Sequence, residues 1–229
     1  MLISDHTVLV TGASAGLGLQ FVTEALARGA TKVYAGARRD IPLTDDRIVP
    51  LRLDVTDAAS IADAATAAPD VDILINNAGI SAGSSLLTSP LSDIRKVFDT
   101  NVFGILEMTR AFAPILAARG GGAVVDIASA LSWIAMPGAY SSSKAAVWGL
   151  TNSLRAELAG QGTQVLGAHL SYAATEMTES LDVPKLSPEM VVTQIFDALE
   201  EGADEAIVDD ITAAVRAALS TNTTAALVP

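Results

Sequence analysis

Tyr140 and Lys144 have the spacing in this sequence that best suits proton chemistry. On a helix, two residues four apart lie on the same face, one turn from each other. A free tyrosine has a pKa of about 10 and is a poor acid or base at neutral pH. A lysine ammonium roughly 5 Å away, at an effective dielectric constant near 20, would favour the phenolate by about 3 kcal/mol and lower that pKa by about two. The pair therefore predicts a general acid/base tuned toward neutral pH.

A second candidate, Thr11-Gly12-Ala13-Ser14-Ala15-Gly16-Leu17-Gly18, has three glycines where an apolar run passes into a helical segment. A strand, a glycine-rich turn and a helix in this order place backbone N–H groups and a helix N-terminus around a pyrophosphate. Gly12 would allow the tight turn, Gly16 the close approach of phosphate, and Gly18 the packing of helix on strand. An ordinary glycine turn is the alternative, which the position at the first strand–helix junction disfavours.

Two arginines, Arg38 and Arg39, follow the second apolar run and bear on the choice of dinucleotide. An NAD site calls for a carboxylate here to bind the ribose 2′-hydroxyl, and an NADP site for an arginine to bind the 2′-phosphate. The first acid after this run is Asp40. The guanidinium fork of Arg38 suits a phosphate, and its flat face can stack on adenine. We therefore expect NADP(H), with NAD(H) as the alternative; the other interpretation is a pair of solvated surface arginines.

The elements that would position these residues alternate along the chain. Apolar runs of strand length are residues 7–10, 32–35, 48–53, 73–75, 123–127, 164–169 and 206–208, and segments of helical character are 17–28, 58–68, 91–119, 140–160, 188–202 and 210–219. Near-continuous apolar strands indicate burial on both faces, as in parallel sheets. The alternation predicts an α/β fold, a single-domain, Rossmann-like, doubly wound parallel sheet of about seven strands with helices on both faces. The domain would span 1–229, with 7–219 as its core and 221–229 as a frayed tail.

Composition excludes several other classes of protein. The 229 residues include 26 acidic and 14 basic side chains, for a net charge of −12. A nucleic-acid partner or an anionic lipid surface would need a basic face, so neither is expected. The lack of cysteine excludes disulfides and thiolate catalysis, and the two histidines, His6 and His169, cannot make a histidine-rich metal site. With no signal-peptide pattern and no run long enough to span a bilayer, we expect a cytoplasmic protein that acts on a small molecule.

The glycine turn, with the spacing Gly-x-x-x-Gly-x-Gly, resembles that of the short-chain dehydrogenase/reductase family, and three later segments resemble the family in its order. They are Leu53-Asp54-Val55-Thr56, Asn76-Asn77-Ala78-Gly79 and Tyr140-Ser141-Ser142-Ser143-Lys144. The resemblance implies that Tyr140 is the general acid/base and that Lys144 also holds the nicotinamide ribose. It further implies that Asp54 accepts a hydrogen bond from the adenine amino group, although a turn or N-cap role is the alternative for this residue. Asn76, Asn77, Ala78 and Gly79 would form a wall at the end of the sheet against the adenine ribose, with an ordinary turn as the alternative for this segment.

Two further catalytic candidates follow from the resemblance. The family places a serine after the fifth strand, where Ser129 would bind the substrate carbonyl oxygen as negative charge develops on it. Ser129 and Tyr140 are two residues closer than is usual in the family, which fits a loop shortened around residues 136–138; Ser132 is the rival candidate. Asn101 resembles the fourth member of the family's tetrad, which would orient a water that relays protons to Lys144. An interior asparagine bonded to backbone is the alternative.

The stretch after the sixth strand departs from the family, which usually has Pro-Gly followed by a threonine. Thr175 matches the threonine expected to bind the nicotinamide carboxamide, whereas Leu170-Ser171 replaces Pro-Gly. Only about a dozen residues separate Thr175 from the next helix, which predicts a short lid and an open cleft. The predicted cofactor-binding residues are Gly12, Ser14, Ala15, Gly16, Leu17, Gly18, Arg38, Arg39, Asp54, Val55, Asn77, Ala78, Gly79, Tyr140, Lys144, Ser171, Thr175 and Met177. The predicted substrate-pocket residues are Leu131, Trp133, Ile134, Tyr172, Met177 and Leu181; Trp133 has a core or interface position as its alternative.

Together these features predict an NADP(H)-dependent oxidoreductase that transfers a hydride between nicotinamide and a carbonyl compound or secondary alcohol. Two alternatives are a halohydrin dehalogenase-like lyase on the same scaffold and a non-catalytic dinucleotide sensor. Such a lyase has an arginine where Lys144 stands, and such sensors tend to lose the tyrosine or the lysine, so both are disfavoured. Alanine-rich stripes on helices 91–119 and 140–160 predict a homodimer or homotetramer, with packing of both stripes on their own sheet as the alternative. His6 is predicted to be a surface turn residue, and His169 a strand residue near the site.

Overall fold

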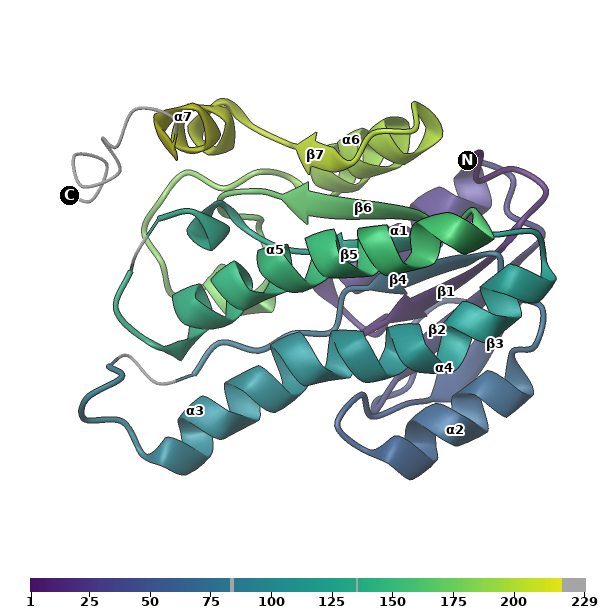
Figure 1. Ribbon diagram of the computed structural model, residues 1–229, viewed down its shortest axis with the longest axis horizontal. Helices are drawn as coiled ribbons and strands as arrows, with labels where there is room; N and C mark the ends of the chain where they lie inside the picture. The colour runs from purple at the N-terminus through teal and green to yellow at the C-terminus, as the bar shows by residue number, and fades with distance from the viewer. Residues whose placement is uncertain (83–84, 135, 220–229) are drawn as a thin grey trace.

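Seven parallel strands form one sheet in the order β3-β2-β1-β4-β5-β6-β7 (Figure 1). They are β1 (Thr7–Thr11), β2 (Lys32–Ala37), β3 (Ile48–Arg52), β4 (Ile73–Asn76), β5 (Ala123–Ile127), β6 (Gln164–His169) and β7 (Glu205–Ile207). This computed structural model describes residues 1–82, 85–134 and 136–219, so the predicted tail at 221–229 lies outside the described residues. The strand order reverses between β1 and β4, and sheets of this kind bind ligands at the carboxyl ends of the strands beside that reversal.

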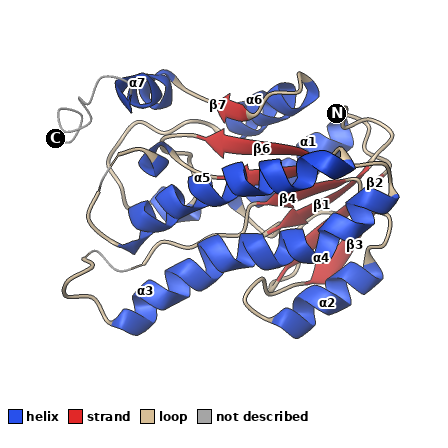
Figure 2. Ribbon diagram, in the orientation of Figure 1, coloured by secondary structure: helices blue, strands red, loops and turns tan. Residues whose placement is uncertain are grey.

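Helices cover both faces of the sheet (Figure 2). They are α1 (Gly16–Ala27), α2 (Ala58–Ala67), α3 (Leu91–Phe98), α4 (Gly104–Ala118), α5 (Ala139–Leu158), α6 (Pro188–Glu200) and α7 (Asp210–Ala218). α1 and α6 pack on one face, and α2, α4 and α5 pack on the other. α7 follows the edge strand β7 and contacts the short 3₁₀ turn Ala130–Ser132. This arrangement confirms the predicted doubly wound α/β fold.

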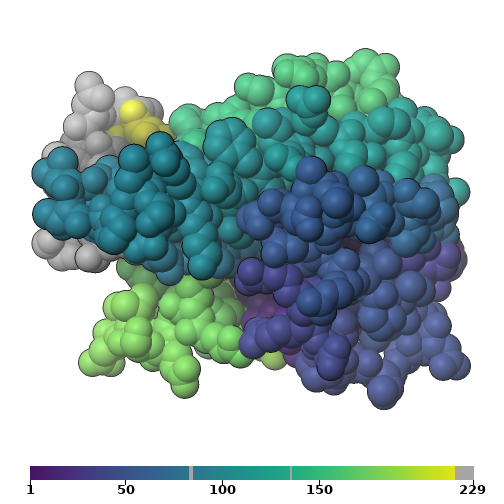
Figure 3. All heavy atoms as spheres, turned by 90° about the horizontal axis from the view of Figure 1, so that it is seen from below, coloured from purple at the N-terminus to yellow at the C-terminus, as the bar shows by residue number. Residues whose placement is uncertain are grey.

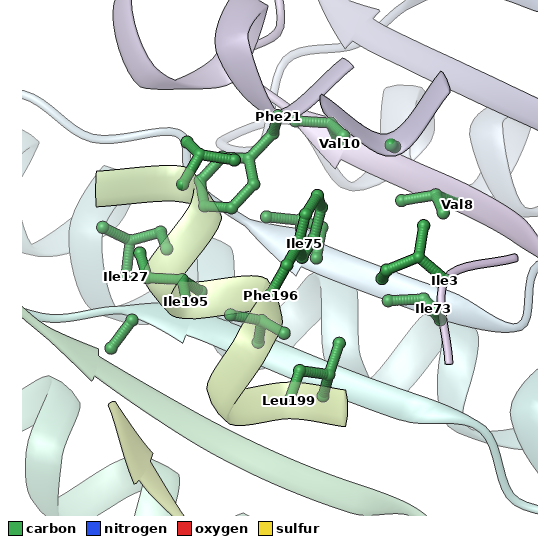
Figure 4. Close-up of a cluster of buried hydrophobic side chains, with 14 of the residues drawn as sticks. Ile3, Val8, Val10, Phe21, Ile73, Ile75, Ile127, Ile195, Phe196 and Leu199 are labelled. Atoms are coloured by element: carbon green, nitrogen blue, oxygen red, sulfur yellow. The ribbon is translucent and has the colours of Figure 1, made fainter. Parts of the chain in front are cut away.

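Alternate residues of each strand face opposite helix layers, which explains why the central strands are apolar on both sides. On β1, Val8 and Val10 join the layer of α1 and α6, whereas Leu9 joins the layer of α2, α4 and α5. In the first layer, drawn in Figure 4, Phe21 and Phe196 meet edge to face with ring centroids 5.3 Å apart. Both rings are fully buried, and truncating such a ring to alanine typically costs about 3–5 kcal/mol. Packing on both sides therefore fixes the strand ends that carry the site.

The predicted helix at 91–119 is wrong in one respect. α3 and α4 are separated by a π-helical segment, Asp99–Phe103, which contains Asn101. At the start of α4, a Cβ on Gly104 would lie only 2.9 Å from Val55 Cγ2, so the helix approaches the loop after β3 closely. Hydrophobic periodicity does not distinguish one wide turn from an α-helical turn, and π-helical turns inside helices are frequent at functional sites. The ends of the other predicted helices and strands lie within two residues of the observed ones.

Candidate active site

A cavity of about 500 Å³ lies at the carboxyl ends of the strands. In Figure 3 a hollow separates the light-green segment that contains the 3₁₀ turn Glu176–Thr178 from purple and blue residues of the N-terminal half. The predicted site residues that line the cavity are Gly12, Ser14, Ala15, Gly16, Leu17, Arg38, Arg39, Asp54, Val55, Asn77, Ala78, Gly79, Ser129, Tyr140, Lys144, Ser171, Thr175 and Met177. The fold thus brings together residues that are widely separated along the chain.

The glycine turn has the backbone that its sequence predicts. Gly12 and Gly16 have φ angles of +68° and +53°, a region that residues with a Cβ rarely adopt. Gly18 does not line the cavity but packs behind it, where a Cβ would overlap the carbonyl oxygen of Gly12. Ala15, the N-cap of α1, provides no side-chain cap, and the first turn of α1 has no acidic residue. The N-terminal N–H groups of α1 are therefore available to an anion.

Asn77 ties the glycine turn to the end of β4. Its Nδ2 donates to the carbonyl oxygens of Thr11, at 2.9 Å, and Gly12, at 3.4 Å. In return, Thr11 Oγ1 accepts hydrogen bonds from the backbone N–H groups of Asn77 and Ala78. The Asn-Asn-Ala-Gly segment therefore does more than line a wall, because it fixes the turn that precedes α1.

Arg38 and Arg39 stand at the rim with exposed side chains, each near a carboxylate. Arg38 Nη1 lies 3.8 Å from Asp54 Oδ2, and Arg39 Nη2 lies 3.6 Å from Glu176 Oε2. Asp54 also accepts hydrogen bonds from the backbone and the hydroxyl of Thr56. Partial burial opposes ionisation of Asp54, but the Thr56 hydrogen bonds and the charge of Arg38 hold its pKa below the ordinary value. Both arginines are thus charged, accessible groups within reach of an anion in the cavity.

Tyr140 and Lys144 lie on one face of α5, as their spacing predicts. Lys144 Nζ is 5.5 Å from the centroid of the Tyr140 ring and donates a 2.6 Å hydrogen bond to the carbonyl oxygen of Ile127 at the end of β5. The predicted lowering of the tyrosine pKa is wrong, however. Burial raises the pKa of Tyr140 to about 12, and burial lowers the pKa of Lys144 to about 8 against the opposing charge of Asp126. The interior disfavours the phenolate more strongly than the lysine stabilises it.

The structure separates the two serine candidates. Ser129 is buried on the cavity wall as the N-cap of the 3₁₀ turn, and its Oγ accepts a 3.1 Å hydrogen bond from the backbone N–H of Leu131. Ser132 does not line the cavity, and its Oγ donates to the carbonyl oxygen of Lys144 at 3.0 Å. Ser129 therefore shares the cavity with Tyr140, whereas Ser132 braces α5.

Asn101 lies behind the cavity wall and is almost completely buried. Its Oδ1 accepts from the backbone N–H of Ile80, while its Nδ2 donates to the carbonyl oxygen of Ile80 and to Ser143 Oγ. The side chain thus joins the loop after β4 to α5, one residue before Lys144. With its amide engaged in this way, Asn101 has the contacts expected of the alternative, an interior asparagine bonded to backbone.

The predicted substrate pocket is realised only in part. Met177 lines the cavity, whereas Leu131, Trp133, Ile134, Tyr172 and Leu181 do not. Trp133 is buried and stacks on His169, in keeping with its alternative as a core residue. Sequence reasoning missed the lining residues Ala37, Leu53, Ile80, Thr100, Ile127, Ala128, Leu170, Ala173, Glu176 and Thr178. Nearly all of them are direct neighbours of predicted residues, so counting outward from each strand end would have found most of them.

Other kinds of site find no support in the described parts of the chain. Residues 1–82, 85–134 and 136–219 contain no group of three or more metal-ligating side chains placed to hold an ion. Across the same residues, every helix is too short or too polar to cross a membrane.

Comparison with known proteins identifies the family. Residues 6–185 match the family model described as short chain dehydrogenase. The chain is 36% identical over 206 residues to 2-(R)-hydroxypropyl-CoM dehydrogenase of Xanthobacter autotrophicus, covering 82% of each protein. It is 37% identical over 183 residues to galactitol 2-dehydrogenase (L-tagatose-forming) of Cereibacter sphaeroides, covering 74% of this chain and 72% of the relative.

A solved structure supports the same family assignment over the full length of this chain. The crystal structure of a short chain dehydrogenase from Burkholderia cenocepacia in complex with NADP superposes on this chain with a TM-score of 0.95. The two chains are 34% identical, and the superposition covers 100% of each. Because the family model spans the glycine turn and the Tyr140–Lys144 pair, and relatives and a solved structure agree with it, this chain belongs to the short-chain dehydrogenase family of oxidoreductases.

Proposed function

We propose that this protein is an NADP(H)-dependent oxidoreductase that interconverts a carbonyl compound and a secondary alcohol. The observation that carries the proposal is that one cavity contains the glycine turn, two arginines, and the side chains of Ser129, Tyr140 and Lys144. A phosphate-binding turn and a proton donor in one cavity suit hydride transfer coupled to proton transfer.

The chain's own residues fit a dinucleotide. Gly12 and Gly16 line the cavity with positive φ angles, Gly18 allows α1 to pack closely behind them, and the N-terminal N–H groups of α1 have no side-chain cap. These N–H groups would hold the pyrophosphate, and Lys144 would hold a ribose. Arg38 and Arg39 would take the 2′-phosphate of NADP, in agreement with the NADP bound by the Burkholderia cenocepacia relative. When bound, the nicotinamide supplies or accepts the hydride.

Tyr140 is the proposed proton donor to the carbonyl oxygen. Its pKa of about 12 keeps the hydroxyl protonated across the neutral range, which suits reduction. Lys144, whose pKa is about 8, carries its charge at neutral pH near the same ring and stabilises the tyrosinate left after proton transfer. Ser129 Oγ, which lines the same cavity, would donate to the same carbonyl oxygen.

The substrate is proposed to be neutral and mainly apolar at its reacting end. The described lysines and arginines that line the cavity are Lys144 and the two rim arginines, all of which already have roles with the dinucleotide. Ile80 and Met177 add apolar surface to the wall. The names of two relatives, a 2-(R)-hydroxypropyl-CoM dehydrogenase and a galactitol 2-dehydrogenase, support a secondary alcohol as the group that is oxidised.

The test is to follow NADPH and NADH oxidation by absorbance against aldehydes, aryl ketones, β-keto esters and bulky cyclic ketones. We expect turnover that depends on NADPH more than on NADH. Tight NADPH binding without turnover on a wide panel would contradict the proposal in favour of a dinucleotide sensor. Failure to bind either dinucleotide would overturn the interpretation of the glycine turn.

A further inference from the structure

His169, at the end of β6, is fully buried directly behind the segment that carries Ser129. Its Nδ1 lies 3.1 Å from the carbonyl oxygen of Ser129. A carbonyl oxygen only accepts hydrogen bonds, so the ring proton must be on Nδ1. Burial lowers the pKa of His169 to about 4, so the ring is neutral at physiological pH and Nε2 has no proton.

The second ring nitrogen of His169, Nε2, forms no hydrogen bond with the described residues. Nε2 of His169 and Nε1 of Trp133 are both buried without a hydrogen-bond partner among the described residues. A buried polar atom without a partner is unfavourable, so an apolar ring would pack here at lower cost. The one polar interaction that the His169 ring makes in the described structure is its bond to Ser129. This contact is therefore the feature that an imidazole supplies and a phenyl ring would not.

A column of flat groups fixes the orientation of that imidazole. The indole of Trp133 stacks on it, with ring centroids 4.1 Å apart and planes inclined by 18°. The guanidinium of Arg216, from α7, lies 5.0 Å from the Trp133 ring. Glu205 of β7 holds Arg216 through two nitrogens at 3.0 Å, and it accepts a 2.9 Å hydrogen bond from Trp148 Nε1. Arg216 of α7 is thereby held against the indole that stacks on His169.

We propose that His169 is a positioning residue for Ser129, held in place by the Arg216–Trp133 stack from α7. Its N–H fixes the backbone of Ser129, and with it the direction in which Ser129 Oγ meets a substrate oxygen. This inference rests on the proposed function for the role of Ser129 in the reaction. It assigns a purpose to α7, which contributes no residue to the cavity lining.

The test compares His169→Phe, which keeps a ring for Trp133 but has no N–H, with His169→Asn, whose amide nitrogen is as many bonds from Cβ as imidazole Nδ1. His6→Phe is the matched control, because His6 Nδ1 makes a similar 2.8 Å contact with the carbonyl oxygen of Ser4, far from the cavity. We expect kcat for carbonyl reduction to fall on the order of 10- to 100-fold in His169→Phe. His169→Asn should recover most of this loss, and the Kd for NADPH should stay unchanged in all three variants.

A second measurement needs no substrate. The amides of Ala130 and Leu131, which bond to Leu170 and to Ser129 Oγ, report on the Ser129 backbone by hydrogen exchange. These two amides should exchange roughly tenfold faster in His169→Phe than in the wild type. The same increase is expected in Arg216→Gln. Because Arg216 is half-exposed, this variant tests the contact with Trp133 even if His169→Phe does not fold.

Unchanged kcat and unchanged exchange in His169→Phe would overturn the inference. Equal losses in His169→Phe and His169→Asn would also overturn it, because the ring shape rather than the N–H would then matter. If the wild-type protein reduces no carbonyl compound, the proposed function fails, and the exchange experiment still decides whether His169 holds Ser129.

Discussion

Burial shifts the pKa values of Tyr140 and Lys144, both on α5, in opposite directions. Tyr140 becomes a weaker acid, with a pKa of about 12, and Lys144 becomes a weaker base, with a pKa of about 8. Both shifts favour the neutral form, because a low-dielectric environment disfavours charge. At neutral pH the proton therefore resides on the tyrosine, which makes Tyr140 ready to act as an acid in carbonyl reduction.

Tyr140→Phe tests this role directly. The variant should bind NADPH normally, because the lost hydroxyl is the proposed proton donor and not a phosphate ligand. Its turnover in carbonyl reduction should fall on the order of 10²- to 10⁴-fold, the usual contribution of a general acid. Tyr34→Phe removes a hydroxyl that bonds to Asp70 on the far side of the fold and should leave turnover unchanged. Near-normal turnover in Tyr140→Phe would exclude Tyr140 as the acid.

Arg38→Asp tests the choice of dinucleotide. Replacing a cation at the rim with an anion should weaken NADPH binding on the order of 10- to 100-fold, because a charge-assisted hydrogen bond to the 2′-phosphate contributes about 1.5–3 kcal/mol. NADH, which lacks that phosphate, should be affected much less. Titration of both dinucleotides by fluorescence provides the measurement, with Arg39→Asp as the comparison. Equal effects of Arg38→Asp on the two dinucleotides would move the phosphate site elsewhere.

His169 gives the stability of the protein a particular pH dependence. The folded-state pKa of about 4 lies below the ordinary histidine value of 6.5, so between these pH values the unfolded chain binds more protons on this ring than the folded protein does. Its contribution to stability is therefore complete above pH 6.5 and is lost as the pH falls toward 4, by about 2 kcal/mol between pH 7 and pH 5. Urea unfolding at these two pH values should show a smaller loss in His169→Phe than in the wild type. Equal losses would mean that the ring already binds a proton in the folded state.

At the scale of elements, the local sequence pattern predicts the bounds of strands and helices well. It does not predict contacts between residues that are distant in sequence. The mainly apolar runs located β5 and β6 to the residue, because strands buried on both faces carry apolar side chains at most of their positions. The π-helical segment at Asp99–Phe103 went unpredicted because its side chains keep a pattern compatible with an α-helix. The stack of Trp133 on His169 also escaped prediction, since it depends on the pairing of β5 with β6. For the same reason Trp133 was placed in the substrate pocket.

The first turn of α1 provides a test at this scale, because Gly18 has no room for a side chain. A Cβ at this position would overlap the carbonyl oxygen of Gly12, so Gly18→Ala must displace the turn or the helix. We expect the Kd for NADPH to rise at least about tenfold, since well-formed phosphate contacts need the turn in its native position. Gly160→Ala is the control, because a Cβ there would meet nothing within 4 Å. Unchanged NADPH affinity in Gly18→Ala would mean that the turn does not hold the pyrophosphate.

At the scale of the whole molecule, one face of α5 packs into the core and another points away from the sheet. Val147 and Leu154 of α5 pack into the layer shared with α2 and α4. Ala145 and Gly149 lie one turn apart on the opposite face and are exposed, and a Cβ on Gly149 would meet nothing within 4 Å. Ala145, one residue of the predicted stripe on this helix, therefore does not pack on the protein's own sheet, whereas Leu154 does. Small residues at this spacing would let a second helix approach closely.

We therefore predict that the protein forms dimers or tetramers through the exposed face of α5. The double variant Ala145→Glu/Gly149→Glu should be monomeric, because an interface of two such faces would bury four like charges close together without partners. Sedimentation velocity provides the measurement. Ala67→Glu, at an exposed site on α2, should keep the wild-type mass. A wild-type protein that sediments as a monomer at micromolar concentration would contradict this prediction, and the exposed face of α5 would then be in contact with solvent. The cavity is lined by residues of one chain, so the active site would then function in the monomer.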